Sequence, residues 1–379
     1  MTEVHGHCDD RFAGVREAFE ANFRERDELG AAVAVFVDGR PVADLWGGWA
    51  DRARTRPWER DTVVDVWSTT KGVTALCAHL LAERGLLDLD AEVARYWPEF
   101  AANGKEGVLV RHLLSHRSGV AGLSEPLSAR ELYDWETTIA RLAAQKPLWE
   151  PGSASGYHVL TFGHLVGEVI RRITGLLPSA FLEREITGPL GIDFTIGLPE
   201  KEYGRAAELI PPPAMTSTQQ AEMLASLTPV AVAALANPPL GAAAANSPAW
   251  RAAEIPAAGG HGTARAVAEL YGLLAGERGL LSPEAVERVR EGQGSCRDLV
   301  LGARFGRDTE IALGLWLSGA HGSYGPNPRA FGHDGFGGSC GLADPEARVS
   351  LGYVMNRMGP HLADDPRKSA LVEAVYAAL

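Results

Sequence analysis

Ser68 and Lys71 are the residues whose types and spacing most directly allow chemistry. They stand three positions apart at the start of a predicted helix, directly after the apolar run 63–67, so their side chains share one helix face. A serine hydroxyl attacks slowly until a base takes its proton, and a lysine whose pKa is lowered by burial can be that base. Backbone N–H groups at a helix start also favour developing negative charge. The pair suggests acyl transfer, although the tetrapeptide alone fits the capped start of a surface helix better.

A sheet built from both ends of the chain would have to carry this helix. Five strand-like runs flank the central part of the chain, at residues 31–37, 41–47, 331–336, 339–344 and 349–355. The first two are joined at Asp38-Gly39, a strong hairpin signal, and the last two turn at Asp344-Pro345-Glu346. Amphipathic helices that open at Asp10 and at Pro366 would cover the sheet. If all five runs pair, they form a single antiparallel sheet.

The central part of the chain has helical periodicity instead. Helices are predicted at residues 68–85, 110–115, 129–145, 157–174 and 178–186. An Ala- and Pro-rich stretch follows at 205–258, where we expect helices and loops that form a lid or a pocket wall. The predicted fold class is therefore α/β plus all-α. Residues 1–62 and 260–379 would form the α/β domain, and residues 63–259 a mainly helical domain that carries Ser68.

Four stretches, in this order, resemble motifs of the serine β-lactamase and penicillin-binding-protein superfamily. The stretch Val66–Val73 resembles its S-x-x-K nucleophile segment, and His112–Gly119 resembles its H-L-L-x-H-x-S-G segment. Pro151-Gly152 with Tyr157 resembles the region of its catalytic tyrosine. Gly332–Gly335 resembles its K-T-G strand, which is H-x-G in many esterases and peptidases. The resemblance covers about residues 31–355. It implies the β-lactamase/transpeptidase-like fold, with an active site in the cleft between the two regions.

The resemblance also implies a role for each matching residue. Ser68 would be the acylated nucleophile, Lys71 its base, and Tyr157 the tyrosine that relays a proton to the serine and to the leaving group. The oxyanion hole would consist of the backbone N–H groups of Ser68 and Phe336, with Gly335 allowing the backbone to approach the substrate closely. Positive charge on Lys71 would lower the pKa of the Tyr157 phenol toward neutrality.

Two positions depart from the β-lactamase pattern. The asparagine of the family's Y-x-N is Val159 here, and valine cannot bind the amide side chain of a β-lactam by a hydrogen bond. The strand lysine that would pair with the carboxylate of the antibiotic is His333, which is largely neutral at pH 7. Both changes leave the acyl-transfer groups in place, a combination that resembles family VIII carboxylesterases. The resemblance therefore implies a serine carboxylesterase that needs no metal and no organic cofactor.

Three other motifs carry less weight. Gly337-Gly338-Ser339-Cys340-Gly341 fits the G-x-S-x-G nucleophile elbow, but strand-like residues lie on both sides of it, where the elbow requires a helix to follow. His112 and His116 have the spacing of helical zinc ligands but lack a third ligand, so we expect helix-end hydrogen bonds. The segments 5–8 and 259–262 are interpreted as a flexible tail and as a backbone turn at the pocket floor, respectively.

Chain length, net charge and cysteine spacing limit the number of structural units, the kinds of partner and the location that we expect. The 379 residues suggest two or three structural units, and a net charge of −12 disfavours nucleic acid and anionic membranes as partners. Residues 1–26 contain no apolar stretch long enough for a signal peptide, and no run of about 18 apolar residues occurs. The four cysteines are isolated. We expect a cytoplasmic protein with free thiols that acts on a small-molecule ester.

Other functions stay open at this stage. The chain is also compatible with an acyltransferase similar to the statin side-chain acyltransferases, with an amidase or D-amino-acid peptidase, and with a weak β-lactamase. A non-catalytic acyl-binding or sensor domain is the alternative outside the enzymes. The joint presence of Ser68, Lys71 and Tyr157 favours an enzyme. The physiological acyl group, the alcohol and the oligomeric state do not follow from the sequence.

Overall fold

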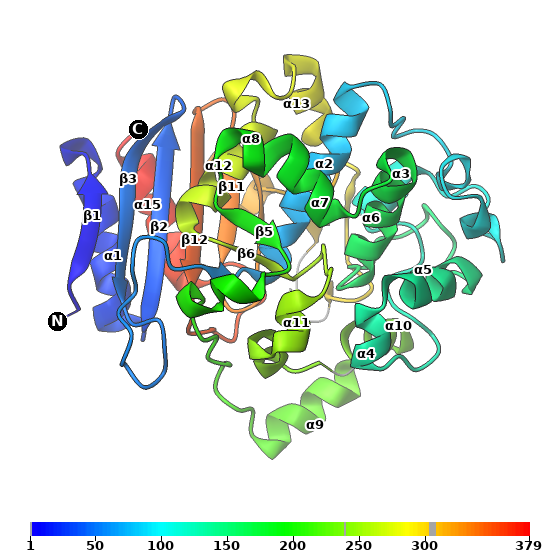
Figure 1. Ribbon diagram of the computed structural model, residues 1–379, viewed down its shortest axis with the longest axis horizontal. Coiled ribbons are helices and arrows are strands. Elements are labelled where there is room, and N and C mark those ends of the chain that lie inside the picture. The colour runs from blue at the N-terminus through cyan, green and yellow to red at the C-terminus, as the bar shows by residue number, and fades with distance from the viewer. Residues whose placement is uncertain (1, 239, 303–307) are drawn as a thin grey trace.

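The computed structural model describes residues 2–238, 240–302 and 308–379, and both chain ends contribute to its largest sheet (Figure 1). The strands lie in the order β1-β3-β2-β12-β11-β10-β9, and neighbours are antiparallel. Their bounds are β1 Val4–Cys8, β2 Gly30–Val37, β3 Arg40–Gly48, β9 Trp316–Leu317, β10 Phe331–Asp334, β11 Cys340–Asp344 and β12 Val349–Met355. All five predicted strand runs pair in this sheet. The turn between β2 and β3 is at Asp38-Gly39, as expected, with both residues at positive φ.

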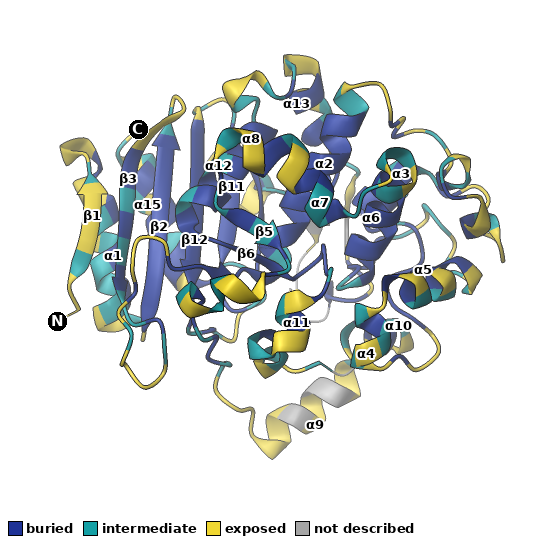
Figure 2. Ribbon diagram, in the orientation of Figure 1, coloured by how far each residue is buried: buried dark blue, intermediate teal, exposed yellow. Residues whose placement is uncertain are grey.

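Helices cover both faces of the sheet, which explains why its central strands are apolar along their length. β12 is buried throughout and β2 up to its last residue (Figure 2). The helices α1 (Ala13–Glu25) and α15 (Pro366–Ala377) pack against each other behind the sheet in Figure 1, as the sequence predicts. On the other face, α12 (Ala264–Leu274) packs on β12, β11 and β2. Gly352 permits this close approach, because a Cβ there would lie 2.1 Å from the Ala264 carbonyl oxygen.

The other helices gather beside the sheet around α2 (Thr70–Glu83), which is buried along most of its length and packs on α6, α7 and α12 (Figures 1 and 2). Their bounds are α3 Val110–Leu114, α4 Ala129–Tyr133, α5 Trp135–Ala144, α6 Thr161–Thr174, α7 Pro178–Leu182, α8 Gly188–Leu190, α9 Ser217–Ser226, α10 Pro229–Leu235, α11 Pro248–Ala252 and α13 Pro283–Val289. The single helix predicted for residues 129–145 is two helices, because the Asp134 carboxylate accepts the N–H of Thr137 at 2.8 Å and caps a new start. The residue boundaries predicted for the two domains stay a prediction.

Two smaller sheets among the described residues consist of short strands, and in the first of them the strands are distant in the sequence. β4 (Val64–Asp65), β6 (Gly260–Gly262) and β5 (Phe194–Ile196) form a second sheet in the order β4-β6-β5, and β7 (Ser295–Cys296) pairs with β8 (Thr309–Glu310). The turn predicted for residues 259–262 is therefore wrong, since this glycine-rich segment pairs as β6 with strands on both sides. The flexible tail predicted for residues 5–8 is also wrong. These residues pair with β3 as edge strand β1, and their exposed side chains give no apolar pattern to read.

Candidate active site

Ser68 lies in a one-turn 3-10 helix (Trp67–Thr69) that runs directly into α2. Several contacts fix this turn. The hydroxyl of Thr70 donates to the Trp67 carbonyl oxygen at 2.6 Å, and the hydroxyl of Tyr271, from α12, donates to the Thr69 carbonyl oxygen at 2.8 Å. Trp67 has a φ of 48°, a left-handed conformation that costs a bulky residue about 1–3 kcal/mol and persists only where its surroundings impose it. Ser68 is therefore presented by a constrained backbone.

Lys71 meets Ser68 across one helical turn, as their spacing predicts. The Lys71 Nζ lies 3.2 Å from the Ser68 Oγ, and it donates to the carbonyl oxygens of Val159 at 2.8 Å and Ala257 at 3.0 Å. The lysine is completely buried, and burial lowers its pKa well below the usual value. A neutral amine has two N–H bonds and one lone pair. In its neutral form, which burial favours, the amine can donate to the two carbonyl groups and keep its lone pair for the proton of Ser68.

Tyr157 lies in a loop before α6, not at the start of the helix as predicted, since α6 begins only at Thr161. Its hydroxyl interacts with Ser68, and the Lys71 Nζ lies 4.8 Å from the centre of its ring. The expectation that Lys71 lowers the pKa of this phenol toward neutrality is wrong. Burial of Tyr157 raises its pKa above the ordinary value, and the interaction with Ser68 opposes this rise only in part. Tyr157 is therefore a protonated phenol that can donate to an oxygen at Ser68.

Two residues hold the Tyr157 loop: Asp298, which the sequence analysis missed, and His116, which belongs to the second of the four motifs. The carboxylate of Asp298 accepts the N–H of Tyr157 at 3.0 Å and those of Val300 and Leu301 at 2.8 Å each. The ring of His116 packs on the Tyr157 ring with centroids 4.8 Å apart, and its Nδ1 accepts the N–H of His158. The sequence does not reveal the role of Asp298, because Tyr157 is 141 residues away in the chain. The bonds to Val300 and Leu301 are local, but they do not point to the Tyr157 loop.

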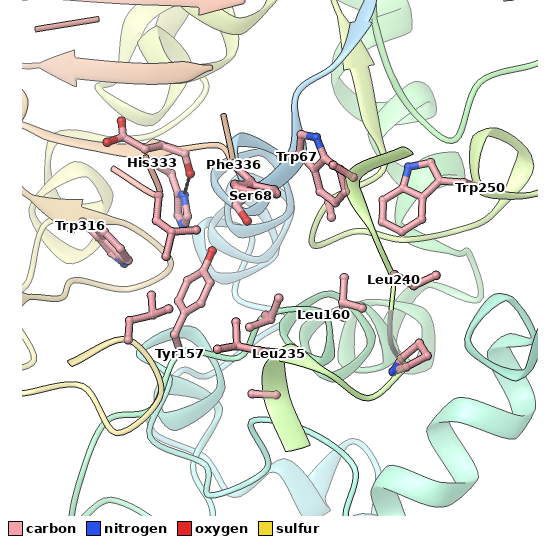
Figure 3. A pocket seen from close by; sticks show the side chains of 18 residues that line it. Trp67, Ser68, Tyr157, Leu160, Leu235, Leu240, Trp250, Trp316, His333 and Phe336 are labelled. Atoms are coloured by element: carbon pink, nitrogen blue, oxygen red, sulfur yellow. Dashed lines mark hydrogen bonds between the residues drawn. The ribbon is translucent and has the colours of Figure 1, made fainter. Parts of the chain in front are cut away.

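An apolar pocket of about 200 Å³ opens beside Ser68 (Figure 3). The expected wall from the 205–258 stretch is confirmed, since part of that stretch lines the pocket. The lining residues are Trp67, Ser68, Tyr157, Val159, Leu160, Ala234, Leu235, Pro238, Leu240, Ala242, Trp250, Ala258, Leu301, Trp316, His333, Asp334, Phe336 and Leu362. In Figure 3, Trp67, Trp250 and Leu240 lie on one side of Ser68, and His333 and Trp316 lie on the other. No lysine or arginine is among these residues, and the carboxylate of Asp334 pairs with Lys368 at 3.3 Å.

His333 is a neutral member of this lining. Burial lowers its pKa to about 3, and its Nδ1 lies 2.8 Å from the Asp334 carbonyl oxygen. The single proton of the neutral ring is therefore on Nδ1, and Nε2 is an acceptor. Within the described part of the chain, Nε2 has no hydrogen-bond partner. The ring that replaces the lysine of the β-lactamase pattern thus brings an acceptor to the pocket and no positive charge.

The loop after β10 brings Phe336 to the pocket and Gly335 behind it. Neither the Ser68 N–H nor the Phe336 N–H donates to a protein acceptor among the residues the structure describes, so both can donate to a substrate oxygen. The structure shows a packing reason for glycine at position 335. Gly335 is absent from the lining, and a Cβ there would lie 2.3 Å from the Val66 carbonyl oxygen and 2.0 Å from the Ser339 Oγ. The glycine therefore allows the turn after β10 to approach the strand that leads to Ser68.

The motifs that carry less weight have structural roles. Ser339 is buried between β10 and β11, where its hydroxyl donates to the Val66 carbonyl oxygen at 2.8 Å, and the element directly after it is the strand β11, not a helix. His112 accepts the N–H of Leu109, so the expected helix-end hydrogen bond is confirmed for this residue. The expectation is wrong for His116, whose Nδ1 accepts the N–H of His158 from the Tyr157 loop. Cys8, Cys77 and Cys340 have free thiols, and the side chain of Cys296 lies outside the described residues. No helix in the described ranges has the length and apolar character needed to cross a bilayer.

Known proteins share this architecture over its whole length. The family model described as Beta-lactamase matches residues 16–375. The esterase/beta-lactamase LipL of Mycobacterium tuberculosis is 38% identical over 368 residues, which cover 94% of this chain and 83% of that protein. A family VIII carboxylesterase structure (TM-score 0.92) and a penicillin-binding protein homologue from Caulobacter crescentus (TM-score 0.91) are each 42% identical, with both chains fully covered.

The fold and these relatives define the class: a serine hydrolase with the β-lactamase/transpeptidase-like fold, as the motifs imply. The chain belongs to the Beta-lactamase family, within the serine β-lactamase-like superfamily.

Proposed function

We propose that the protein hydrolyses carboxylic esters through an acyl-enzyme on Ser68. The observation that carries the proposal is the contact of 3.2 Å between the Lys71 Nζ and the Ser68 Oγ. The lysine is buried, burial lowers its pKa, and its Nζ also donates to the carbonyl oxygens of Val159 and Ala257. The relatives named an esterase/beta-lactamase and a family VIII carboxylesterase support the same chemistry. The pocket needs no metal for this reaction, since a serine and a base suffice.

The steps follow from the geometry. Lys71 takes the proton of Ser68 while Oγ forms a bond to the ester carbonyl carbon. The N–H groups of Ser68 and Phe336 donate to the resulting oxyanion. The bond to the alcohol oxygen then breaks, the alcohol leaves with the proton of Tyr157, and the proton held by Lys71 restores the phenol. A water molecule repeats the sequence on the acyl-enzyme and releases the carboxylic acid.

The lining of the pocket favours esters over β-lactams. A β-lactam antibiotic carries a carboxylate and an amide side chain, which need a cation and a hydrogen-bond partner. His333 is neutral, and the side chain of Val159 has no polar atom. A lost hydrogen bond costs about 0.5–1.5 kcal/mol, and one to a charged group about 1.5–3 kcal/mol. A simple ester has neither group, so it loses nothing at these two positions.

We expect short-chain p-nitrophenyl esters to be turned over at least about a hundredfold more efficiently than nitrocefin in kcat/KM, a difference of roughly 2.7 kcal/mol. The measurement is a series of p-nitrophenyl esters of increasing acyl length beside nitrocefin, with mass spectrometry of the acylated Ser68 peptide. Equal kcat/KM for nitrocefin and p-nitrophenyl butyrate would contradict the assignment to esters.

The double variant Val159→Asn, His333→Lys tests the reason for the preference. It supplies both missing contacts, so nitrocefin turnover should rise relative to ester turnover. A ratio that does not change would show that other residues discriminate against the antibiotic.

A further inference from the structure

Asp65 is a buried carboxylate three residues before the nucleophile, and no step of the proposed reaction uses it. It stands at the end of β4 and is 3% exposed. Its two oxygens have separate donors. Oδ1 accepts the backbone N–H of Trp67 at 2.8 Å, and Oδ2 accepts the indole N–H of Trp250 at 2.7 Å. One carboxylate therefore joins the turn that presents Ser68 to the helix α11, which lies 185 residues away in the sequence.

Both donors belong to the wall of the pocket. The rings of Trp67 and Trp250 line it on the same side of Ser68 in Figure 3, with ring centroids 5.2 Å apart. The Trp67 ring also meets the ring of Phe336 edge-on at 5.7 Å, next to the N–H assigned to the oxyanion. A displacement of Asp65 would therefore reach the nucleophile, the oxyanion donor and the apolar wall together.

The backbone of Trp67 shows why such an anchor is needed. Its left-handed φ of 48° is unfavourable for a residue with a large side chain. Asp65 accepts the backbone N–H of this residue and Thr70 donates to its carbonyl oxygen, so both backbone polar groups of the strained residue are fixed. The strain points to function, because it places Ser68 at the start of α2.

The hydrogen bonds from the backbone N–H of Trp67 and the indole N–H of Trp250 are the main interactions that stabilise the carboxylate of Asp65. His261, from β6, lies 3.9 Å from Oδ2, but burial lowers the pKa of this imidazole to about 4, so it is neutral. Arg251 on α11 is a charged group that also acts on Asp65 and opposes the rise of its pKa. Burial raises the pKa of Asp65 to about 7, while the hydrogen bonds from Trp250 and Trp67 oppose this rise. A buried carboxyl group at this position is costly unless its hydrogen bonds are made.

We propose that Asp65 is a positioning residue that fixes the Ser68 turn and the Trp67–Trp250 wall, and so sets both the rate of acylation and the length of the acyl group accepted. The inference rests on the proposed esterase function. It places the acyl chain of the substrate on the Trp67–Trp250 side of the pocket. We expect an uncharged chain, because no lysine or arginine is among the described residues that line the pocket.

Asp65→Asn is the first test. The amide keeps one acceptor oxygen, but its NH2 group faces a second N–H, so one of the two hydrogen bonds is lost. We expect the rate of Ser68 labelling by a fluorophosphonate to fall at least tenfold, and kcat to fall for p-nitrophenyl esters of every length. Because the NH2 group repels one N–H and displaces the side chain from both donors, the Trp67–Trp250 wall loosens, and the ratio of kcat/KM for the octanoate to that for the butyrate should rise at least threefold.

Glu168→Gln is the matched control. Glu168 is also a fully buried carboxylate that accepts an indole N–H, from Trp135 at 2.9 Å, but none of its partners lines the pocket. This variant should lower the melting temperature and keep the labelling rate and the chain-length ratio. If Asp65→Asn also lowered only the melting temperature, Asp65 would be merely structural and the inference would be wrong.

Trp250→Phe keeps the test decisive if Asp65→Asn does not fold. It removes the indole N–H but leaves the bond from Trp67 to Asp65, so the chain-length ratio should shift while labelling slows by less than tenfold. An unchanged ratio would overturn the assignment of the acyl side. If the esterase proposal is wrong, the unmodified protein will not turn over esters. The rates of fluorophosphonate labelling would still test the role of Asp65 in that case.

Discussion

Ser68→Ala should lose essentially all ester turnover, with kcat lower by on the order of 10⁵-fold, while Ser339→Ala should keep most of it. The hydroxyl of Ser68 contacts the buried Lys71 and faces the pocket. Ser339 is 1% exposed, and its hydroxyl donates a hydrogen bond to the Val66 carbonyl oxygen and has no lysine among its hydrogen-bond partners in the described part of the chain. Its removal costs stability, by about 1–3 kcal/mol for the acceptor left unsatisfied, rather than chemistry.

The comparison needs rates per folded molecule. Kinetics of the two variants would therefore be measured beside their melting temperatures, and a fluorophosphonate adduct would be mapped by mass spectrometry. Phosphonate on the Ser339 peptide, or a Ser68→Ala variant with near-normal turnover, would show that the glycine-rich motif between β10 and β11 is the nucleophile segment after all.

The elements that the sequence predicts well are those whose signal is local. The turn at Asp38-Gly39, the apolar strands of the main sheet and the cap at Asp365-Pro366 each depend on neighbouring residues, and all are found where expected. The contact of Lys71 with Ser68 follows in the same way from the geometry of one helical turn. These local rules, together with the motif order, were enough to predict the fold and the centre of the site.

The rest of the site depends on contacts between distant segments. The carbonyl groups of Val159 and Ala257 hold the Nζ of Lys71 in place, yet a backbone carbonyl has no sequence signature. Asp65 and Asp298 look like any other aspartate in the sequence, and only the fold shows that they hold Trp67 and Tyr157. The pKa of Tyr157 was mispredicted for a related reason. Its burial, which raises the pKa, is a tertiary property, whereas the sequence shows only that a lysine belongs to the same site.

Lys71→Ala should lower kcat by several orders of magnitude and leave the fold intact, because its role in the proposed reaction is proton transfer. Lys71→Arg should fail almost as badly, since a guanidinium group does not release its proton near neutral pH. Stopped-flow or steady-state rates with p-nitrophenyl butyrate, beside circular dichroism of each variant, would measure both effects. A Lys71→Arg variant with a near-normal rate would mean that position 71 supplies only positive charge, and the base would then have to be Tyr157.

The protonation state of Lys71 can also be tested without catalysis. Burial holds its pKa in the folded protein well below the value of about 10.4 that it has in an unfolded chain. Between these two pKa values the unfolded state binds one more proton, so the contribution of Lys71 to the free energy of unfolding must rise with pH, by at most about 1.4 kcal/mol per unit. We therefore expect the stability of the unmodified protein, measured relative to Lys71→Met, to increase from pH 7 to pH 9 in denaturant titrations. The carbonyl groups of Val159 and Ala257 lose their donor equally at every pH in the methionine variant, so they do not affect this slope. A stability difference that stays constant over this range would show that Lys71 is charged in the folded protein, and a charged amine cannot take the proton of Ser68.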